Sequence, residues 1–216
     1  AAFQNHAVNN VMAIACRKMA EGEILQLYAN CQPLLKESDY LRIVEYKTGA
    51  LVAAACKVGA IIGGASPLQQ ESQYQFGLHL GIAFQLADDH LDYSATRDNL
   101  GKTLGQDLIQ GMITLPLLSL LQNCSHKERQ DLVKKIESKT IKANDLVRIT
   151  AMMKQYGSLQ YTATRSQEYI DAALVKLDSF PESPAKQALA VVADYMVNLS
   201  LIHISEPTRR YAISYA

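Results

Sequence analysis

The stretch GLHLGIAFQLADDHLDY, residues 77–93, decides the fold class of this chain. Its first half is apolar almost all the way round, which is typical of a helix buried inside a bundle. Its second half carries Asp88, Asp89 and Asp92. The spacings of four and three place Asp88 and Asp92 on one helical face with Asp89 at its edge, and Gln85 lies on the same side one turn earlier. The stretch therefore predicts a buried helix that ends in a cluster of carboxylates.

Such a cluster needs electrostatic compensation. Three carboxylates at the C-terminal end of a buried helix repel one another, and the helix dipole adds negative partial charge there. Hard divalent cations bind carboxylate oxygens, and Mg²⁺ usually takes one or two of them together with water and substrate phosphates. A solvated acidic helix end is the alternative. The apolar residues before the cluster and the basic loop after it favour a metal site.

Two further segments carry cations that suit a phosphate group. The loop GKTLGQD, residues 101–107, has two glycines that allow close backbone approach, and its Lys102 can oppose a metal-bound anion. Lys47 and Thr48 open a helix of small residues with a cation followed by a hydroxyl. A surface loop and an exposed lysine are the alternatives. Beside the aspartate cluster, the loop is a candidate phosphate clamp.

Apolar residues recur at three- and four-residue spacing along most of the chain, and alternating runs are few, which predicts an all-α fold. Asp107 and Gln110 form a plausible capping box for a helix interrupted by Pro116. After residue 198 neither helical nor strand periodicity is visible. The predicted helices cover residues 11–29, 40–63, 67–93, 125–137, 143–156, 158–177 and 186–197.

The composition excludes several classes of protein. The chain has 216 residues, 49% of them hydrophobic, and 21 basic against 21 acidic side chains, which excludes a generic nucleic-acid binder and a disordered chain. Four cysteines without metal spacing indicate reduced thiols. The most apolar segment, residues 49–65, is short and interrupted by Lys57, so we expect no transmembrane segment. With no signal peptide visible, we expect a cytoplasmic protein.

The motifs together resemble a known family. FQLADDHLDY followed by GKTLGQDLIQGMITLPLL resembles the second aspartate-rich region of trans-polyprenyl diphosphate synthases. MAEGEILQL, YKTGALVAAACKVGAIIGG and SPAKQALAVVADYMVN are similar to its flanking helices, in the expected order. GSLQYTATRSQEYIDAALVKLDSFP looks like the late helices of the long-chain, octaprenyl-like branch. The resemblance covers residues 1–198 and implies an isoprenoid-synthase-type helical bundle.

The resemblance also implies roles for particular residues. Asp88, Asp89 and Asp92 would form the second Mg²⁺-binding motif, and Lys47 and Lys102 would bind the allylic diphosphate. The implied reaction condenses isopentenyl diphosphate with an allylic diphosphate by ionisation, condensation and elimination, to make a polyprenyl diphosphate.

Other site residues come from the same resemblance. Thr48 and Gln85 would line the site near the developing carbocation, with Gln26 a weaker candidate for that wall. Met112 stands where many members place a lysine, which removes one cation from the diphosphate site. The family also implies a homodimer.

Both ends of the chain depart from the family pattern. The first aspartate-rich motif is absent, so we expect an N-terminally truncated synthase, lacking its N-terminal helices and inactive on its own. LSLIHISEPTR resembles the in-frame translation of a sequencing-library adapter, and residues 199–216 are therefore predicted to be a non-native or disordered tail.

Three other interpretations remain open from the sequence. A non-catalytic partner subunit of a heteromeric polyprenyl diphosphate synthase fits the missing first motif, although the intact aspartates and Lys102 argue against it. A terpene cyclase also uses an aspartate-rich motif, but the lysine-bearing segments disfavour it. A purely structural bundle is the third.

Overall fold

The computed structural model describes residues 5–94 and 105–205, with side chains as far as residue 196. All regular structure within these residues is helical, as the sequence predicts. The elements are α1 (His6–Ala29), α2 (Glu37–Val44), the π-helical turn η1 (Glu45–Gly49), α3 (Ala50–Ile62), α4 (Pro67–Ser94), α6 (Gln106–Ile109), α7 (Leu115–Asn123), α8 (His126–Glu137), α9 (Ala143–Gln155), α10 (Ser158–Lys176), the 3₁₀ turn η2 (Leu177–Ser179) and α11 (Pro184–Ser205).

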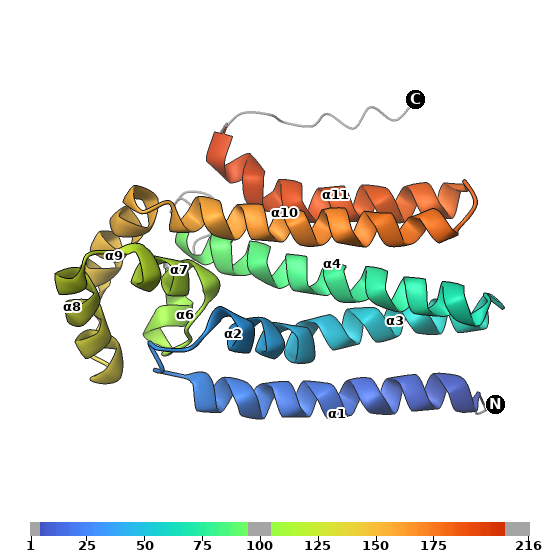
Figure 1. Ribbon diagram of the computed structural model, residues 1–216, viewed down its shortest axis with the longest axis horizontal. Coiled ribbons are helices and arrows are strands. Elements are labelled where there is room, and N and C mark those ends of the chain that lie inside the picture. The colour runs from blue at the N-terminus through green and yellow to red at the C-terminus, as the bar shows by residue number, and fades with distance from the viewer. Residues whose placement is uncertain (1–4, 95–104, 206–216) are drawn as a thin grey trace.

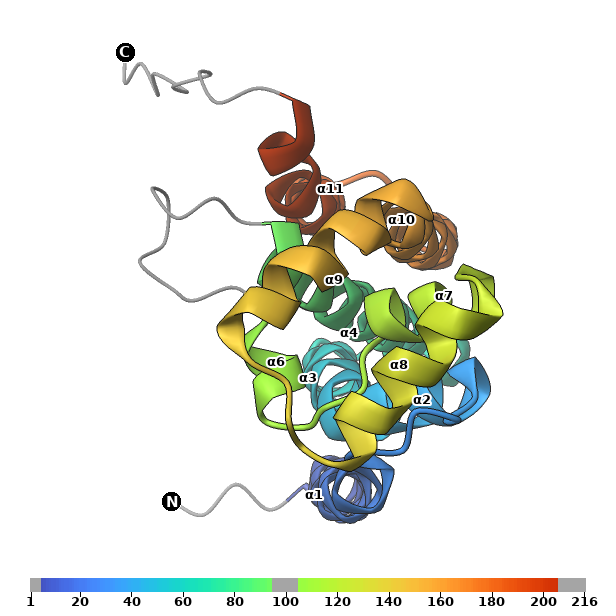
Figure 2. The same ribbon diagram turned by 90° about the vertical axis from the view of Figure 1, so that its left-hand side faces the viewer.

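The long helices lie side by side along the long axis, and the shorter helices α6 to α9 gather at one end (Figures 1 and 2). Helix α4 packs against α3, α10 and α11, and the outermost helix α1 packs on α3 and η1. Because α4 runs toward the short helices, its C-terminal aspartates lie at that end of the bundle (Figure 1).

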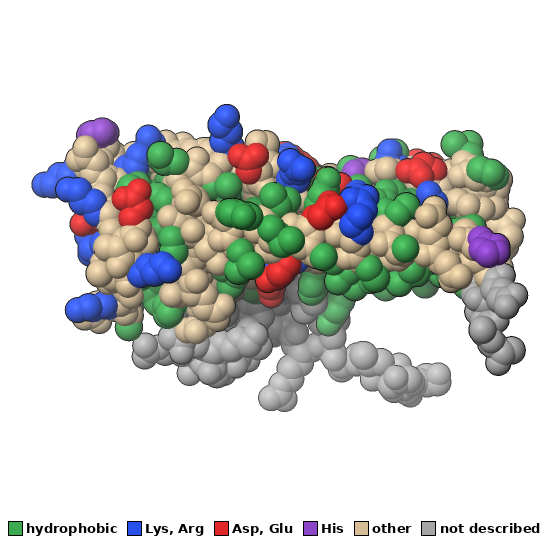
Figure 3. Space-filling view, turned by 90° about the horizontal axis from the view of Figure 1, so that it is seen from below, with side chains coloured by type: hydrophobic (Ala, Val, Ile, Leu, Met, Phe, Trp, Pro, Cys, Tyr) green, Lys and Arg blue, Asp and Glu red, His purple; other side chains and the backbone are tan. Residues whose placement is uncertain are grey.

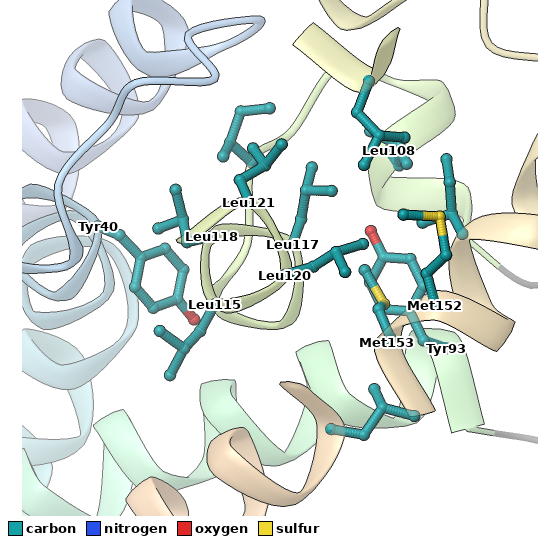
Figure 4. Close-up of a cluster of buried hydrophobic side chains, with 14 of the residues drawn as sticks. Tyr40, Tyr93, Leu108, Leu115, Leu117, Leu118, Leu120, Leu121, Met152 and Met153 are labelled. Atoms are coloured by element: carbon teal, nitrogen blue, oxygen red, sulfur yellow. The ribbon is translucent and has the colours of Figure 1, made fainter. Parts of the chain in front are cut away.

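Two clusters of buried hydrophobic side chains stabilise this arrangement. The larger one joins the C-terminal half of α4 to α2 and the short helices. Figure 4 shows its α7 leucines between the rings of Tyr40 and Tyr93. The smaller one lies among α4, α10 and α11 and includes Phe76, Leu80 and Ile170. Most of the apolar first half of residues 77–93 is therefore buried, as predicted, with Phe84 as an exposed exception.

Most predicted helices are confirmed, with shifted ends. The predicted helix 40–63 is α2, η1 and α3 in unbroken succession, and it contains a π-helical turn that the sequence did not predict. Helix α11 continues to Ser205, past the predicted end at residue 197. The boundary that we predict after residue 198, between a partial synthase domain and a non-native or disordered tail, stays a prediction.

The expected capping box at Asp107 is wrong. Helix α6 begins at Gln106, so Asp107 lies in its first turn, and Gly105 precedes it in the left-handed conformation that glycine adopts easily. Pro116 does not interrupt a helix but lies in the first turn of α7, where its missing N–H costs nothing. From the sequence alone, a proline in the first turn of a helix cannot be distinguished from a proline that interrupts a helix.

The structure also bears on the cysteines and on the expectation of no transmembrane segment. The four cysteines are free thiols. In the part of the chain that the structure describes, we find no helix with both the length and the apolar character needed to span a membrane.

Candidate functional site

The C-terminal part of α4 and the turn η1 face each other through hydrogen-bonded side chains. The Thr48 hydroxyl donates to Oε1 of Gln85 over 2.9 Å. The Gln85 amide Nε2 in turn donates to Oδ1 of Asp89, also over 2.9 Å. The structure thus brings together three of the residues that the sequence analysis singled out.

A fourth member of this network, Tyr40 on α2, was missed by the sequence analysis. Its side chain is buried with 4% exposed, and its hydroxyl donates to Oδ2 of Asp89. A buried tyrosine usually finds a partner for its hydroxyl, which is the one signal available from sequence. That signal does not identify the partner, because Tyr40 and Asp89 are 49 residues apart in the chain.

Asp89 is a buried carboxyl group, 2% exposed. Burial raises its pKa to about 7, and the nearby carboxylates of Asp107 and Asp88 act in the same direction. The hydrogen bonds from Tyr40 and Gln85 oppose the rise because they stabilise the charged form. The two oxygens of Asp89 therefore have protein partners at a site where a bare carboxylate is unfavourable.

The other two aspartates have different surroundings. Asp88 is exposed. Asp92 is half-buried, and its carboxylate accepts the backbone N–H groups of Gln106 and Asp107, each over 3.2 Å. It thereby caps the first turn of α6, where orphan N–H groups attract an anion. Asp92 fastens α6 to the end of α4, and Asp88 faces solvent.

The predicted cation Lys47 lies outside this network. Nζ of Lys47 is 3.0 Å from Oε2 of Glu23 on α1, in a partly exposed ion pair. Gln26, one turn after Glu23, donates from Nε2 to Oδ1 of Asn30 over 3.1 Å. Lys102 lies outside the residues that the structure describes.

No three His, Cys, Asp or Glu side chains within the described ranges are grouped so that they could hold a metal ion. A cation at this end of α4 would therefore need further ligands that these residues do not supply. The predicted role of Asp88, Asp89 and Asp92 as metal ligands stays a prediction. Of the three, the exposed Asp88 is the one whose position suits an incoming cation.

An apolar pocket of about 600 Å³ lies toward the other end of α3 and α4. Ala55 and Gly59 of α3, with Gly63 just after that helix, form one wall. Phe180, in the turn between α10 and α11, and Leu189 of α11 form another. The α3–α4 pair thus combines a hydrogen-bonded polar end with a hollow apolar end.

This architecture agrees with a match to a protein-family model. Residues 1–153 match the family described as Polyprenyl synthetase. The chain belongs to the polyprenyl synthetase family. This membership confirms the resemblance drawn from the aspartate-rich and lysine-bearing segments.

Curated relatives of this polyprenyl synthetase chain include both long-chain and short-chain isoprenyl diphosphate synthases. The octaprenyl diphosphate synthase of Escherichia coli is 36% identical over 190 residues, which are 88% of this chain and 58% of that protein. An all-trans-nonaprenyl-diphosphate synthase of Rhodobacter capsulatus, described as geranyl-diphosphate specific, is 40% identical over 172 residues, 80% of this chain and 52% of that protein. The chain thus spans little more than half the length of either relative.

Solved structures confirm the isoprenoid-synthase helical fold. A decaprenyl diphosphate synthase from Rhodobacter capsulatus superposes with a TM-score of 0.85 and 36% identity, over 91% of this chain and 60% of that one. A polyprenyl synthase from Caulobacter crescentus, complexed with calcium and isoprenyl diphosphate, has a TM-score of 0.85 and 35% identity, over 89% of this chain and 59% of that one.

Proposed function

We propose that the protein to which this chain belongs condenses isopentenyl diphosphate with an allylic diphosphate to make a polyprenyl diphosphate. The observation that carries the proposal is the hydrogen-bonded line from Thr48 through Gln85 to Asp89, next to the exposed carboxylate of Asp88. Family membership supports the same reaction class. Because the chain spans only part of its relatives, we propose that it binds substrate but does not turn over alone.

The residues of α4 suit a magnesium ion held jointly with substrate. Asp88 would be the carboxylate that contacts it, while Asp89 and Asp92, already bonded to protein donors, would hold the helix end in place. One carboxylate is enough for Mg²⁺ when substrate phosphates and water complete its shell. Bound there, the ion would neutralise charge on the departing diphosphate. A relative that is complexed with both calcium and isoprenyl diphosphate supports the proposal of a divalent cation together with a diphosphate substrate.

The cationic side chains would bind the diphosphate, and the polar side chains would stabilise the allylic cation. Lys47 would leave Glu23 and donate to the diphosphate, and Lys102 would be its second cation. The oxygens of Thr48 and Gln85 would stabilise the allylic cation left behind, which the isopentenyl double bond attacks before a proton is lost. Their positions are fixed by mutual hydrogen bonds, so little reorganisation is needed during ionisation.

An apolar path for the prenyl chain supports the proposal. Leu51, Ala55 and Gly59 follow Lys47 at four-residue intervals and so lie along one side of α3. They lead to the pocket of about 600 Å³, which Ala55 and Gly59 line. Phe84 on α4 is exposed, one turn before Asp88. A diphosphate near Lys47 would thus place its apolar tail along small and hydrophobic side chains.

We also propose that the protein is a homodimer in the cytoplasm. The free thiols support a reducing compartment. Hydrophobic side chains spread over the face on which α1 lies (Figure 3). The exposed apolar side chains of α1 include Met12, Ile14, Ile24, Leu27 and Tyr28, which suits a face covered by another subunit.

A prenyl-transfer assay tests the proposed reaction. The full-length gene product, given Mg²⁺, geranyl diphosphate and labelled isopentenyl diphosphate, should form a label-bearing lipid. Lys47→Gln should slow this transfer, whereas Lys57→Gln, which removes a cation paired with Glu71 instead, should not. Failure to form product with any allylic primer, combined with stimulation of a separate active synthase, would favour the partner-subunit alternative.

A further inference from the structure

The π-helical turn η1 is an unusual backbone that needs support. In η1 the hydrogen bonds span five residues, so that the Ala50 N–H bonds to the carbonyl of Glu45. Such turns are rare and occur frequently at functional sites. Here the widened turn carries both Lys47 and Thr48, so its backbone geometry fixes the positions of their Cα and Cβ atoms.

Two neighbouring helices approach this turn closely. A Cβ atom added at Gly22 of α1 would lie 2.6 Å from the backbone nitrogen of Lys47. A Cβ atom added at Gly81 of α4 would lie 2.8 Å from Cα of Gly49. These contacts limit the turn from two sides, but a glycine has no side chain that could orient the side chains that the turn carries.

Direction comes from the hydrogen-bonded chain that begins at Tyr40. The ring of Tyr40 lies in the larger hydrophobic cluster, which fixes the position of its hydroxyl (Figure 4). That hydroxyl holds Oδ2 of Asp89, while Oδ1 of Asp89 holds the Gln85 amide. The bond to Asp89 leaves Oε1 of Gln85 facing Thr48, which donates to it.

The chain of bonds returns to the helical stretch from which it starts. Tyr40 belongs to α2 and Thr48 to η1, and both are tied to α4, through Asp89 and Gln85 one helical turn apart. When Asp89 is ionised, each hydrogen-bonding group has one defined role, because the carboxylate only accepts and the amide donates on one side and accepts on the other. The chain is therefore tied to α4 both before the π-helical turn, at Tyr40, and within it, at Thr48.

We propose that Tyr40 is a positioning residue, whose hydroxyl orients Asp89 and, through Gln85 and Thr48, holds the η1 turn in the shape that presents Lys47. The geometry of this coupling stands without any substrate. Its consequence for diphosphate binding rests on the proposed function.

Amide hydrogen exchange of the substrate-free, metal-free chain tests the coupling. Tyr40→Phe removes only the hydroxyl, and we expect amides of residues 45–50 to exchange about tenfold faster or more, relative to amides of α10 in the same sample. The matched control is Tyr156→Phe, which also removes a hydroxyl bonded to a carboxylate, that of Glu128, over 2.7 Å. It should leave residues 45–50 unchanged. Equal acceleration throughout the chain, or none at residues 45–50, would overturn the proposal.

A second variant keeps the test decisive if Tyr40→Phe does not fold. Thr48→Val breaks the other end of the same chain of bonds and should also accelerate exchange at residues 45–50. Unchanged exchange there would overturn the proposal equally.

Binding of geranyl diphosphate with Mg²⁺ supplies the functional readout. Tyr40→Phe and Thr48→Val should each weaken binding several-fold, and the double variant should be no weaker than the weaker single variant, because both break one chain. Multiplicative losses would contradict coupling. If the wild-type chain binds no allylic diphosphate but Tyr40→Phe still loosens η1, the proposed function fails while the positioning role stands.

Discussion

The two ends of the α3–α4 pair are held together by different physics. At the η1 end, a directional hydrogen bond joins Thr48 to Gln85 across the contact, and a second joins Gln85 to Asp89 within α4. Toward the other end, Gly77 lies so close to α3 that an added Cβ would be 2.6 Å from the carbonyl oxygen of Val52. Beyond that contact the helices border a pocket of about 600 Å³. One end fixes side-chain orientation at the cost of burying a carboxyl group, and the other uses small residues and leaves space.

The largest expected effect is on the pH dependence of the unfolding free energy, to which the η1 end should contribute and the pocket end should not. Because the pKa of Asp89 is about 7 in the folded chain and ordinarily about 3.8, the folded state holds a proton that the unfolded state has released between these values. The contribution of Asp89 to stability is therefore present below pH 4 and is lost as pH rises to 7, by on the order of 4 kcal/mol. Relative to wild type, Asp89→Asn should become more stable over this range in metal-free urea denaturation.

A matched variant at the apolar end is the control for that titration. Cys56 lines the pocket, and its replacement in Cys56→Ser adds no group that titrates between pH 4 and 7. The difference in unfolding free energy between Cys56→Ser and wild type should be constant across this range. If the difference in unfolding free energy between Asp89→Asn and wild type is also constant from pH 4 to 7, burial does not raise the pKa of Asp89.

The next effect breaks the packing at the apolar end. Gly77→Val would force a branched side chain against the backbone of Val52 and Ala53, and we expect a loss of about 3 kcal/mol or more in unfolding free energy. The control is Gly59→Ala, also in a helix of this pair but with nothing within 4 Å of the added Cβ. Gly59→Ala should stabilise the chain by about 0.5–1 kcal/mol. Similar destabilisation by both variants would contradict the close approach at Gly77.

The smallest effect concerns the exposed part of the polar end. Lys47→Gln removes the ion pair with Glu23, which is partly exposed and so contributes little to stability. The unfolding free energy should change by less than about 0.5 kcal/mol. A loss above about 1.5 kcal/mol would mean that Lys47 supports the fold and is not free to serve a ligand.

The sequence predicted most of the fold because its information was local. Helical periodicity and the positions of Pro67 and Gly157 were sufficient to place most helix ends to within a few residues, although α1 begins earlier and α11 ends later than predicted. The capping box at Asp107 failed because a short polar segment next to a glycine fits several helix starts equally well. The π-helical turn could not be predicted, since its support comes from the distant residues Gly22 and Gly81.

The site was predictable in its residue types but not in its connections. Gln85 and Asp89 are one turn apart on a helix, so their contact follows from spacing alone. The bonds from Thr48 and Tyr40 cross between elements, and only the packing of α2 and η1 on α4 produces them. The different surroundings of Asp88, Asp89 and Asp92 arise for the same reason, because exposure depends on what packs against the end of α4.

The most direct test of the account is calorimetric titration of this chain with geranyl diphosphate, with and without Mg²⁺. We predict Mg²⁺-dependent binding that Asp88→Asn weakens at least about tenfold, a loss of about 1.4 kcal/mol. The control Asp131→Asn, which removes a carboxylate paired with Arg148 on the short helices, should stay within about twofold of wild type. Binding that does not depend on Mg²⁺, or that both variants weaken equally, would contradict a diphosphate site at the polar end of α4.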